Sequence, residues 1–200
     1  SFTESGTATT VSVAAGASAA DIAASFNAEV PGARATASTG VRITAATFAA
    51  SNTVSLTVNG VALTGLAADT GATASASIAA AVQGNASLGN LTVTDNADGT
   101  VDLRDSSGED ISIGYTLATN TTIAVQALDA SGTLDGSSVT IASTQGSVIT
   151  GDISFSVTNA AATYSLVSSN GAGNITTATA GGGAGQVQVS SSRVADLDIS

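Results

Sequence analysis

The stretch Ser18–Ser38, SAADIAASFNAEVPGARATAS, predicts a short helix with a signal at each end, followed by a strand. Ser18 with Asp21 three residues later is typical of a helix N-terminus, where a side-chain oxygen accepts a free backbone N–H and an acid suits the helix dipole. Pro31 disfavours helical backbone at the residue before it. The helix is therefore expected to span about residues 19–29.

The same plan recurs later in the chain. Ile22 and Phe26 lie four residues apart on the first predicted helix, and Ile78 and Val82 lie four apart on a second one, over about residues 73–82. Apolar residues follow nine and eleven positions after each pair, namely Ala35 and Ala37 in the first unit and Leu91 and Val93 in the second. This repeated spacing indicates a duplicated unit of strand, helix and two strands, βαββ.

Alternating polar and apolar residues and turn signals predict the strands around the two helices. In the first unit the expected strands cover residues 7–14, 33–38 and 41–47, the last two joined as a hairpin across Thr39-Gly40. In the second unit they cover residues 53–58, 61–63, 91–94, 100–104 and 111–117. Asn59-Gly60 is the strongest short hairpin signal in the chain, and Gly84 is expected to end the second helix as a left-handed cap.

These elements predict an α+β fold with two β-rich domains, each built around a βαββ unit with one short helix packed on an antiparallel sheet. Helical periodicity ends at Thr121, and the strands expected beyond it cover residues 122–127, 138–142, 153–158, 163–167 and 186–190. We expect this last third to complete the sheet of the first unit. Residues 1–50 with 120–200 would then form a proximal, discontinuous domain, and residues 51–119 a distal inserted domain.

Composition excludes several kinds of chemistry. The 200 residues include no lysine, histidine or cysteine, and four arginines face fifteen acids, for a net charge of -11. Without His or Cys, the usual zinc sites, Ser-His or Cys-His nucleophile pairs and thiol redox centres are excluded. Nucleic acid and anionic membranes would repel so acidic a chain, so neither is expected as a partner. No apolar run approaches the ~20 residues of a transmembrane helix, and no signal-peptide pattern opens the chain.

The acids Asp95, Asp98, Asp102 and Asp105 are the candidate cation site, because Ca2+ prefers about six to eight oxygens from closely spaced carboxylates and carbonyls. The EF-hand pattern fails, however. With Gly99 at its glycine position, the twelfth ligand would be Asp105 in place of glutamate. The alternative is a hairpin whose Asp-Gly turn needs positive φ, with Asp102 and Asp105 on a solvated face. We favour this alternative and expect no cofactor and no metal ligands, leaving open a weak Ca2+ site near Asp95 and Asp98.

Two further segments are candidates for catalysis or phosphate binding. Glu109-Asp110 with Asp105 could form the paired carboxylates of a glycosidase, but no Trp or Tyr lies near them in sequence to bind a sugar ring, so solvated loop acids are expected. Gly181–Gly185 lacks the Lys-Ser/Thr of a phosphate loop and is expected to be a flexible loop. We therefore predict no catalytic residues and no enzymatic activity.

Asparagines and arginines complete the set of candidates. The N-glycosylation pattern is matched at four asparagines, Asn85, Asn90, Asn120 and Asn174. Such matches are expected by chance in so Ser/Thr-rich a chain. The four arginines are expected to be surface partners of the abundant acids, and they are Arg34, Arg42, Arg104 and Arg193.

The first unit, a strand, the capped helix of Ser18–Ser38 and a hairpin, resembles the motif that recurs in bacterial flagellins and hook-associated proteins, named for an Ile-Asn pair near the helix end. Here the pair is Phe26-Asn27, and in the second unit it is Val82-Gln83, so each keeps an apolar residue followed by an amide. The final stretch Ser190–Ser200, SSSRVADLDIS, resembles the segment by which flagellin chains leave their outer domains and re-enter the inner helical region.

This resemblance implies the outer, surface-exposed domains of a bacterial flagellin, an extracellular structural protein displayed on the filament used for motility. The partner would be the parent filament, reached through terminal helical domains that are absent from this chain. A Cys-free, Pro-poor chain agrees with export in the unfolded state, since refolding needs no disulfides and few slow X-Pro isomerisations. The isolated chain is expected to be a monomer because its copies repel one another. The alternative is an adhesin-like or surface-layer β-domain that binds glycan or calcium.

Overall fold

The structure is a computed structural model that describes residues 2–4, 7–45, 55–63, 65–66, 71–116, 122–142, 144–157, 164–166, 178–180, 186–189 and 194–197. The fold is α+β, as predicted: antiparallel strands predominate, and the helices are α1 (Ala19–Glu29), α2 (Gly71–Gln83) and the single 3-10 turn η1 (Ala86–Leu88) within these ranges. The strands are β1 (Phe2–Glu4), β2 (Thr7–Thr9), β3 (Ala33–Thr44), β4 (Ser55–Val58), β5 (Val61–Leu63), β6 (Leu91–Asp95), β7 (Thr100–Asp105), β8 (Ile111–Thr116), β9 (Ile123–Leu128), β10 (Leu134–Ile141), β11 (Gln145–Ile149), β12 (Asp152–Val157), β13 (Tyr164–Leu166), β14 (Ala178–Ala180), β15 (Gln186–Val189) and β16 (Val194–Leu197).

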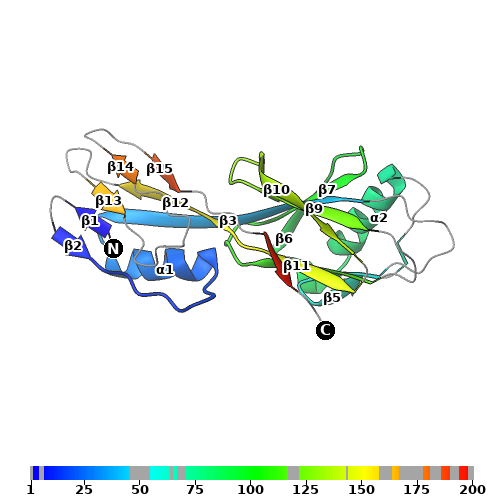
Figure 1. The fold of residues 1–200 in the computed structure, drawn as a ribbon, viewed down its shortest axis with the longest axis horizontal. Coiled ribbons are helices and arrows are strands. Elements are labelled where there is room, and N and C mark those ends of the chain that lie inside the picture. Colours follow the sequence, from blue (N-terminus) through cyan, green and yellow to red (C-terminus); the bar gives the residue numbers. More distant parts are fainter. Residues whose placement is uncertain are drawn as a thin grey trace.

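The strands form three sheets. The largest has the order β10-β9-β3-β12-β15, and β7 also pairs with β3 and carries β6 at its other edge. A second sheet has the order β16-β11-β8-β4-β5, and a small third one has the order β14-β13-β1-β2. Figure 1 shows an elongated molecule in which β3 runs lengthwise, with α1 near one end and α2 near the other. The short strands β1 and β2 lie at the end away from α2, whereas β16 lies beside β11.

β3 differs from the predicted hairpin at Thr39-Gly40, because it is one strand of 12 residues, Ala33–Thr44. Its first half pairs with β12, and its second half lies between β7 and β9. Gly40 does not form a turn; it allows β3 and β9 to approach closely. A Cβ built on Gly40 would lie 2.9 Å from the Cβ of Leu128 on β9. The first unit therefore has a single long strand after its helix where two were expected.

Two hydrophobic cores lie along β3. The smaller one joins α1 to the first half of β3 and to β12, and consists of Ala19, Ala23, Phe26, Val30, Ala33, Ala35, Ile153 and Phe155. The larger one joins α2 to the second half of β3 and to strands β4–β11. It includes Ile123, Val125, Ile141 and Ile149. The predicted domain bounds place these last residues with 1–50, but they pack with residues 56–115, because β9 pairs with β3 and β11 with β8. A division of the chain into two domains stays a prediction.

α1 confirms the helix prediction at both ends. The Ser18 hydroxyl accepts the backbone N–H of Asp21 at 3.2 Å, as an N-cap does. At the other end the N–H of Val30 donates to the carbonyl of Phe26 at 2.9 Å, directly before the proline. Phe26 is buried, and Ile22 is partly buried against the same core. The apolar stripe therefore faces the sheet as its spacing predicts.

The second unit is confirmed in its helix stripe and its first hairpin. Ile78 and Val82 of α2 are buried. Asn59 and Gly60 have φ of 50° and 76°, which a two-residue type I′ turn between β4 and β5 requires. The predicted left-handed cap at Gly84 is wrong, since its φ is not positive and its N–H instead donates to the carbonyl of Ala80 at 2.9 Å. None of the helices in the described ranges is long and apolar enough to cross a membrane.

The side chain of Asn27 completes the edge of β3. Its Nδ2 donates to the carbonyl of Ala35 at 2.8 Å, and its Oδ1 accepts the N–H of Ala35 at 2.7 Å. The amide thus forms both hydrogen bonds that a neighbouring strand would offer at this position. This contact is the structural role of the Phe26-Asn27 pair: the ring anchors the helix and the amide aligns the strand that follows.

We expect Asn27→Ala to lower the free energy of unfolding by about 1 to 3 kcal/mol, because each of two hydrogen bonds contributes a net 0.5 to 1.5 kcal/mol. Urea unfolding of the two proteins measures this loss. Gln83→Ala is the matched control, since Gln83 takes the same place in the second unit and is exposed. Equal losses for the two variants would contradict a special role for Asn27.

Candidate functional site

The four candidate acids lie on the β6–β7 hairpin but do not converge. Asp95 ends β6, Asp98 lies in the turn, and Asp102 and Asp105 lie three residues apart on β7. Side chains of a strand alternate between its faces, so Asp102 points outward while Asp105 points inward and is 2% exposed. The prediction that both lie on a solvated face is therefore wrong for Asp105. The described residues contain no group of three or more His, Cys, Asp or Glu side chains able to hold a metal ion.

Asp95 and Asp98 stabilise the turn between the two strands. Oδ1 of Asp95 accepts the hydroxyl of Ser75 on α2 at 2.8 Å and the N–H of Ala97 at 3.0 Å. Oδ1 of Asp98 accepts the hydroxyl of Thr100 at 2.6 Å and its N–H at 3.0 Å. The hydroxyl bond is the main cause that lowers the pKa of Asp98. These bonds are those of an Asx-type turn, and Gly99 has φ of 92°, the positive φ that the predicted Asp-Gly turn needs.

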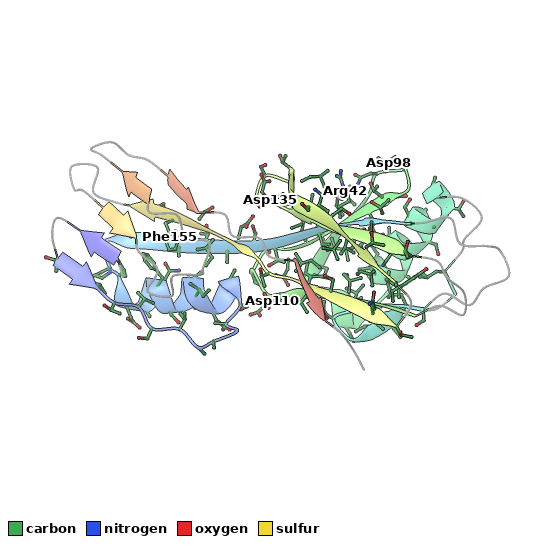
Figure 2. The ribbon with its side chains drawn as sticks, in the orientation of Figure 1. Arg42, Asp98, Asp110, Asp135 and Phe155 are labelled. Carbon is green, nitrogen blue, oxygen red and sulfur yellow. The ribbon has the colours of Figure 1, made fainter. Side chains whose placement is uncertain are left out.

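Asp102 forms an ion pair with Arg42 across the β3–β7 ladder. Nε of Arg42 donates to Oδ1 at 2.7 Å and NH2 donates to Oδ2 at 2.8 Å, so the pair is bidentate. Asp102 raises the pKa of Arg42, chiefly through this hydrogen bond. Figure 2 shows Arg42 and Asp98 near the same edge of the half that contains α2. Arg42 therefore has the acidic partner that the sequence predicts.

We expect a double-mutant cycle with Arg42→Gln and Asp102→Asn to give a coupling energy of about 1 kcal/mol, at the upper end for surface pairs because the geometry is bidentate. Urea unfolding of the four proteins provides the measurement. The control cycle pairs Arg42→Gln with Asp98→Asn, because Asp98 affects Arg42 through charge without a hydrogen bond. Coupling as large in the control cycle would contradict the role assigned to the bidentate contact.

Glu109 is an exposed loop acid as predicted, whereas Asp105 is buried and Asp110 is half-buried, so the prediction of solvated acids is wrong for these two. Oδ2 of Asp105 accepts from Nδ2 of Asn90 at 2.6 Å, and Oδ1 accepts the N–H of Ser107 at 2.8 Å and also its hydroxyl. Both oxygens of this buried carboxylate thus accept hydrogen bonds from within the chain. Asp110 follows the loop and is half-buried.

Arg104 differs from its predicted role. Its guanidinium donates to two carbonyls and not to an acid, those of Asp129 at 2.6 Å and Ala130 at 3.2 Å. It thereby fixes the β9–β10 loop, in which Oδ1 of Asp129 accepts the N–H groups of Ser131 and Thr133 at 2.8 and 2.9 Å. The Ser131 hydroxyl is the main cause that lowers the pKa of Asp129.

The remaining candidates are structural or lie outside the described residues. Oδ1 of Asn85 accepts the N–H of Ser87 at 3.0 Å and caps the 3-10 turn. Asn90 is engaged by Asp105, and Arg34 is exposed on the first half of β3. The other candidates lie outside the described residues, and they are Asn120, Asn174, Gly181–Gly185 and Arg193.

The structure reveals one contact that sequence analysis missed. The carbonyl of Gly108, in the loop between β7 and β8, accepts the N–H of Ala20 in the first turn of α1 at 3.0 Å. Gly108 has φ of 85°, and a Cβ on it would collide with the Cβ of Ala37. The Ser107-Gly108 pair signals a loop, but nothing local in sequence indicates that this loop reaches α1.

No protein-family model matches this chain, and no curated protein matches it in sequence.

Proposed function

We propose that this chain is a non-enzymatic structural module displayed on a cell-surface assembly, of the kind formed by the outer domains of a bacterial flagellin. The proposal that the module is non-enzymatic rests on the hydrogen bonds that the four acids of the candidate cation site accept. Asp95, Asp98, Asp102 and Asp105 each accept hydrogen bonds from within the chain. Side chains engaged in this way stabilise the β6–β7 turn and the ladders beside it.

The shape and the charge support display. β3 runs through both cores, so forces along the long axis act on a continuous strand that pairs with β12 along its first half and with β7 and β9 along its second half. The net charge of -11 keeps neighbouring copies apart in a crowded array. The assignment to flagellin rests on the order of segments and on the Phe26-Asn27 pair, whose amide aligns the strand after the helix.

One arrangement weighs against a flagellin. In a flagellin, both ends of the outer region meet the inner tube together, whereas β1 and β16 of this chain belong to different sheets. The experiment therefore has to detect the chain on filaments directly, because that result does not depend on where β1 and β16 lie.

The test uses immunogold electron microscopy on cells of the source organism, with antibodies raised against this chain. Labelling along the length of flagellar filaments would support the proposal, together with long amphipathic helices encoded on both sides of the 200 residues. Labelling of the cell envelope without filaments would overturn it in favour of a surface-layer or adhesin-like protein. A melting temperature that rises by several degrees in millimolar Ca2+ would favour the calcium-binding form of that alternative.

A further inference from the structure

The two hydrophobic cores meet at a small junction beside the middle of β3. It is formed by the loop of residues 106–110, between β7 and β8, and by the first turn of α1. Gly108 supplies a carbonyl to the N–H of Ala20, one of the first-turn donors that have no partner within a helix. Figure 2 places Asp110 at this narrow middle, between the half that contains α1 and the half that contains α2.

The junction is packed at backbone distance. Gly108 lies so close to Ala37 of β3 that no Cβ fits between them. On the other side Gly151, which directly precedes β12, lies against Thr39 and Ala19, and a Cβ on it would be 3.0 Å from the Cβ of Ala19. The loop is thus docked on α1 and β3. Because the contacts are close-packed, a small change in the neighbouring groups is expected to shift the loop.

The charged groups at this junction are acids. Asp21 faces Asp110 from α1, and Glu109 precedes it on the loop. Asp105 at the start of the loop is fixed by Asn90 and Ser107, and β12 contributes the buried Asp152 beside Gly151.

The charge of Asp110 is unfavourable at this junction. Its Oδ1 is buried and accepts no hydrogen bond from the described residues. Burial raises the pKa of Asp110 above its usual 3.8, and the charges of Glu109 and Asp21 raise it further. A buried carboxylate oxygen without a donor costs free energy when it is charged and much less when it is protonated.

We propose that the β7–β8 loop is a proton-sensitive clamp between the two cores, in which protonation of Asp110 tightens the docking of the loop on α1. The sign follows from linkage. Because docking raises the pKa of this acid, the docked state binds the proton more tightly than the undocked state. Docking is therefore strongest below the ordinary pKa of 3.8 and weakens as pH rises through the raised value. Each pKa unit by which docking raises the pKa of Asp110 corresponds to about a tenfold change in the docking equilibrium.

The experiment is an NMR titration of the whole chain between about pH 2.5 and 7, which includes the ordinary aspartate pKa and the range above it. We expect the carboxyl carbon of Asp110 and the amide of Ala20 to titrate with one common midpoint above 3.8. We also expect the exchange protection of the Ala20 amide, corrected for intrinsic base catalysis, to fall several-fold from the acidic to the neutral end. An Ala20 amide with constant shift and constant protection across this range would overturn the clamp.

Three variants separate Asp110 from its neighbours. Asp110→Asn should abolish the titration of the Ala20 amide, and a response equal to that of the parent would overturn the proposal. Asp21→Asn should keep that titration at a lower midpoint, which shows that the amide does not merely sense Asp21. Glu109→Gln should also lower the midpoint and tests the proposal independently if Asp110→Asn does not fold. A midpoint unchanged in both of these charge variants would contradict the acidic junction as the cause.

Discussion

Replacing Phe26 by Ala should lower the free energy of unfolding by roughly 3 to 5 kcal/mol. The Phe26 ring is 3% exposed and meets the ring of Phe155 edge-to-face, with centroids 4.8 Å apart. The other members of the smaller core are mostly Ala and Val, which cannot move far enough to fill the space of a lost ring. The variant also removes the aromatic contact itself, so Phe155 loses its partner. Urea unfolding measures the loss.

Ile22→Ala is the matched control for this prediction. Ile22 lies on the same stripe of α1 and is only partly buried, so its truncation should cost less than half as much. A loss below about 1 kcal/mol for Phe26→Ala would show that α1 presents this stripe to solvent, because surface substitutions usually stay within about 0.5 kcal/mol.

Elements fixed by local signals could be predicted from the sequence. Ser18 and Pro31 bound α1 because a cap and a proline act on the backbone next to them. Asn59-Gly60 gave the correct hairpin for the same reason, since positive φ at both positions is a property of the pair itself. The α+β class follows from these local features together with the alternation of the strands.

Elements fixed by distant partners could not be predicted. Gly40 has the composition of a turn residue, but its role is to admit Leu128 of β9, which is remote in sequence. β11 has the sequence QGSVI and begins with Gln, Gly and Ser. It could not be predicted because it forms a strand by pairing with β8 on one side and with β16 on the other. Core membership of β9–β11 depends on the same non-local pairings, so the expected domain bounds do not follow the packing.

The candidate site shows the same difference between contacts that are local in sequence and contacts with distant partners. The turn at Asp98-Gly99 is local, and the sequence predicted its positive φ as the alternative to a Ca2+ loop. Arg104 binds carbonyls of the β9–β10 loop, and Gly108 binds α1, and neither partner is adjacent in sequence. Side-chain chemistry alone predicts that an arginine needs acceptors, and only the strand pairing determines which acceptors it meets.

Gly108→Ala should be the other strongly destabilising substitution, with a loss of roughly 2 to 6 kcal/mol. Positive φ, here 85°, costs a non-glycine residue about 1 to 3 kcal/mol when the backbone cannot relax. Overpacking adds about 1 to 3 kcal/mol, because the new methyl group would collide with the backbone and Cβ of Ala37. The backbone of β3 cannot retreat without breaking its ladder with β12 or β7.

Gly16→Ala separates these two contributions. Gly16 has φ of 77°, close to that of Gly108, but a Cβ on it meets nothing within 4 Å, so only the backbone cost applies. Urea unfolding should therefore show a clearly larger loss for Gly108→Ala, and the Ala20 amide should lose exchange protection only in that variant, since its acceptor is displaced. Equal losses in the two variants, with Ala20 protected in both, would mean that the loop between β7 and β8 does not dock on α1. The contact between the two cores would then rest on β3 and its ladders alone.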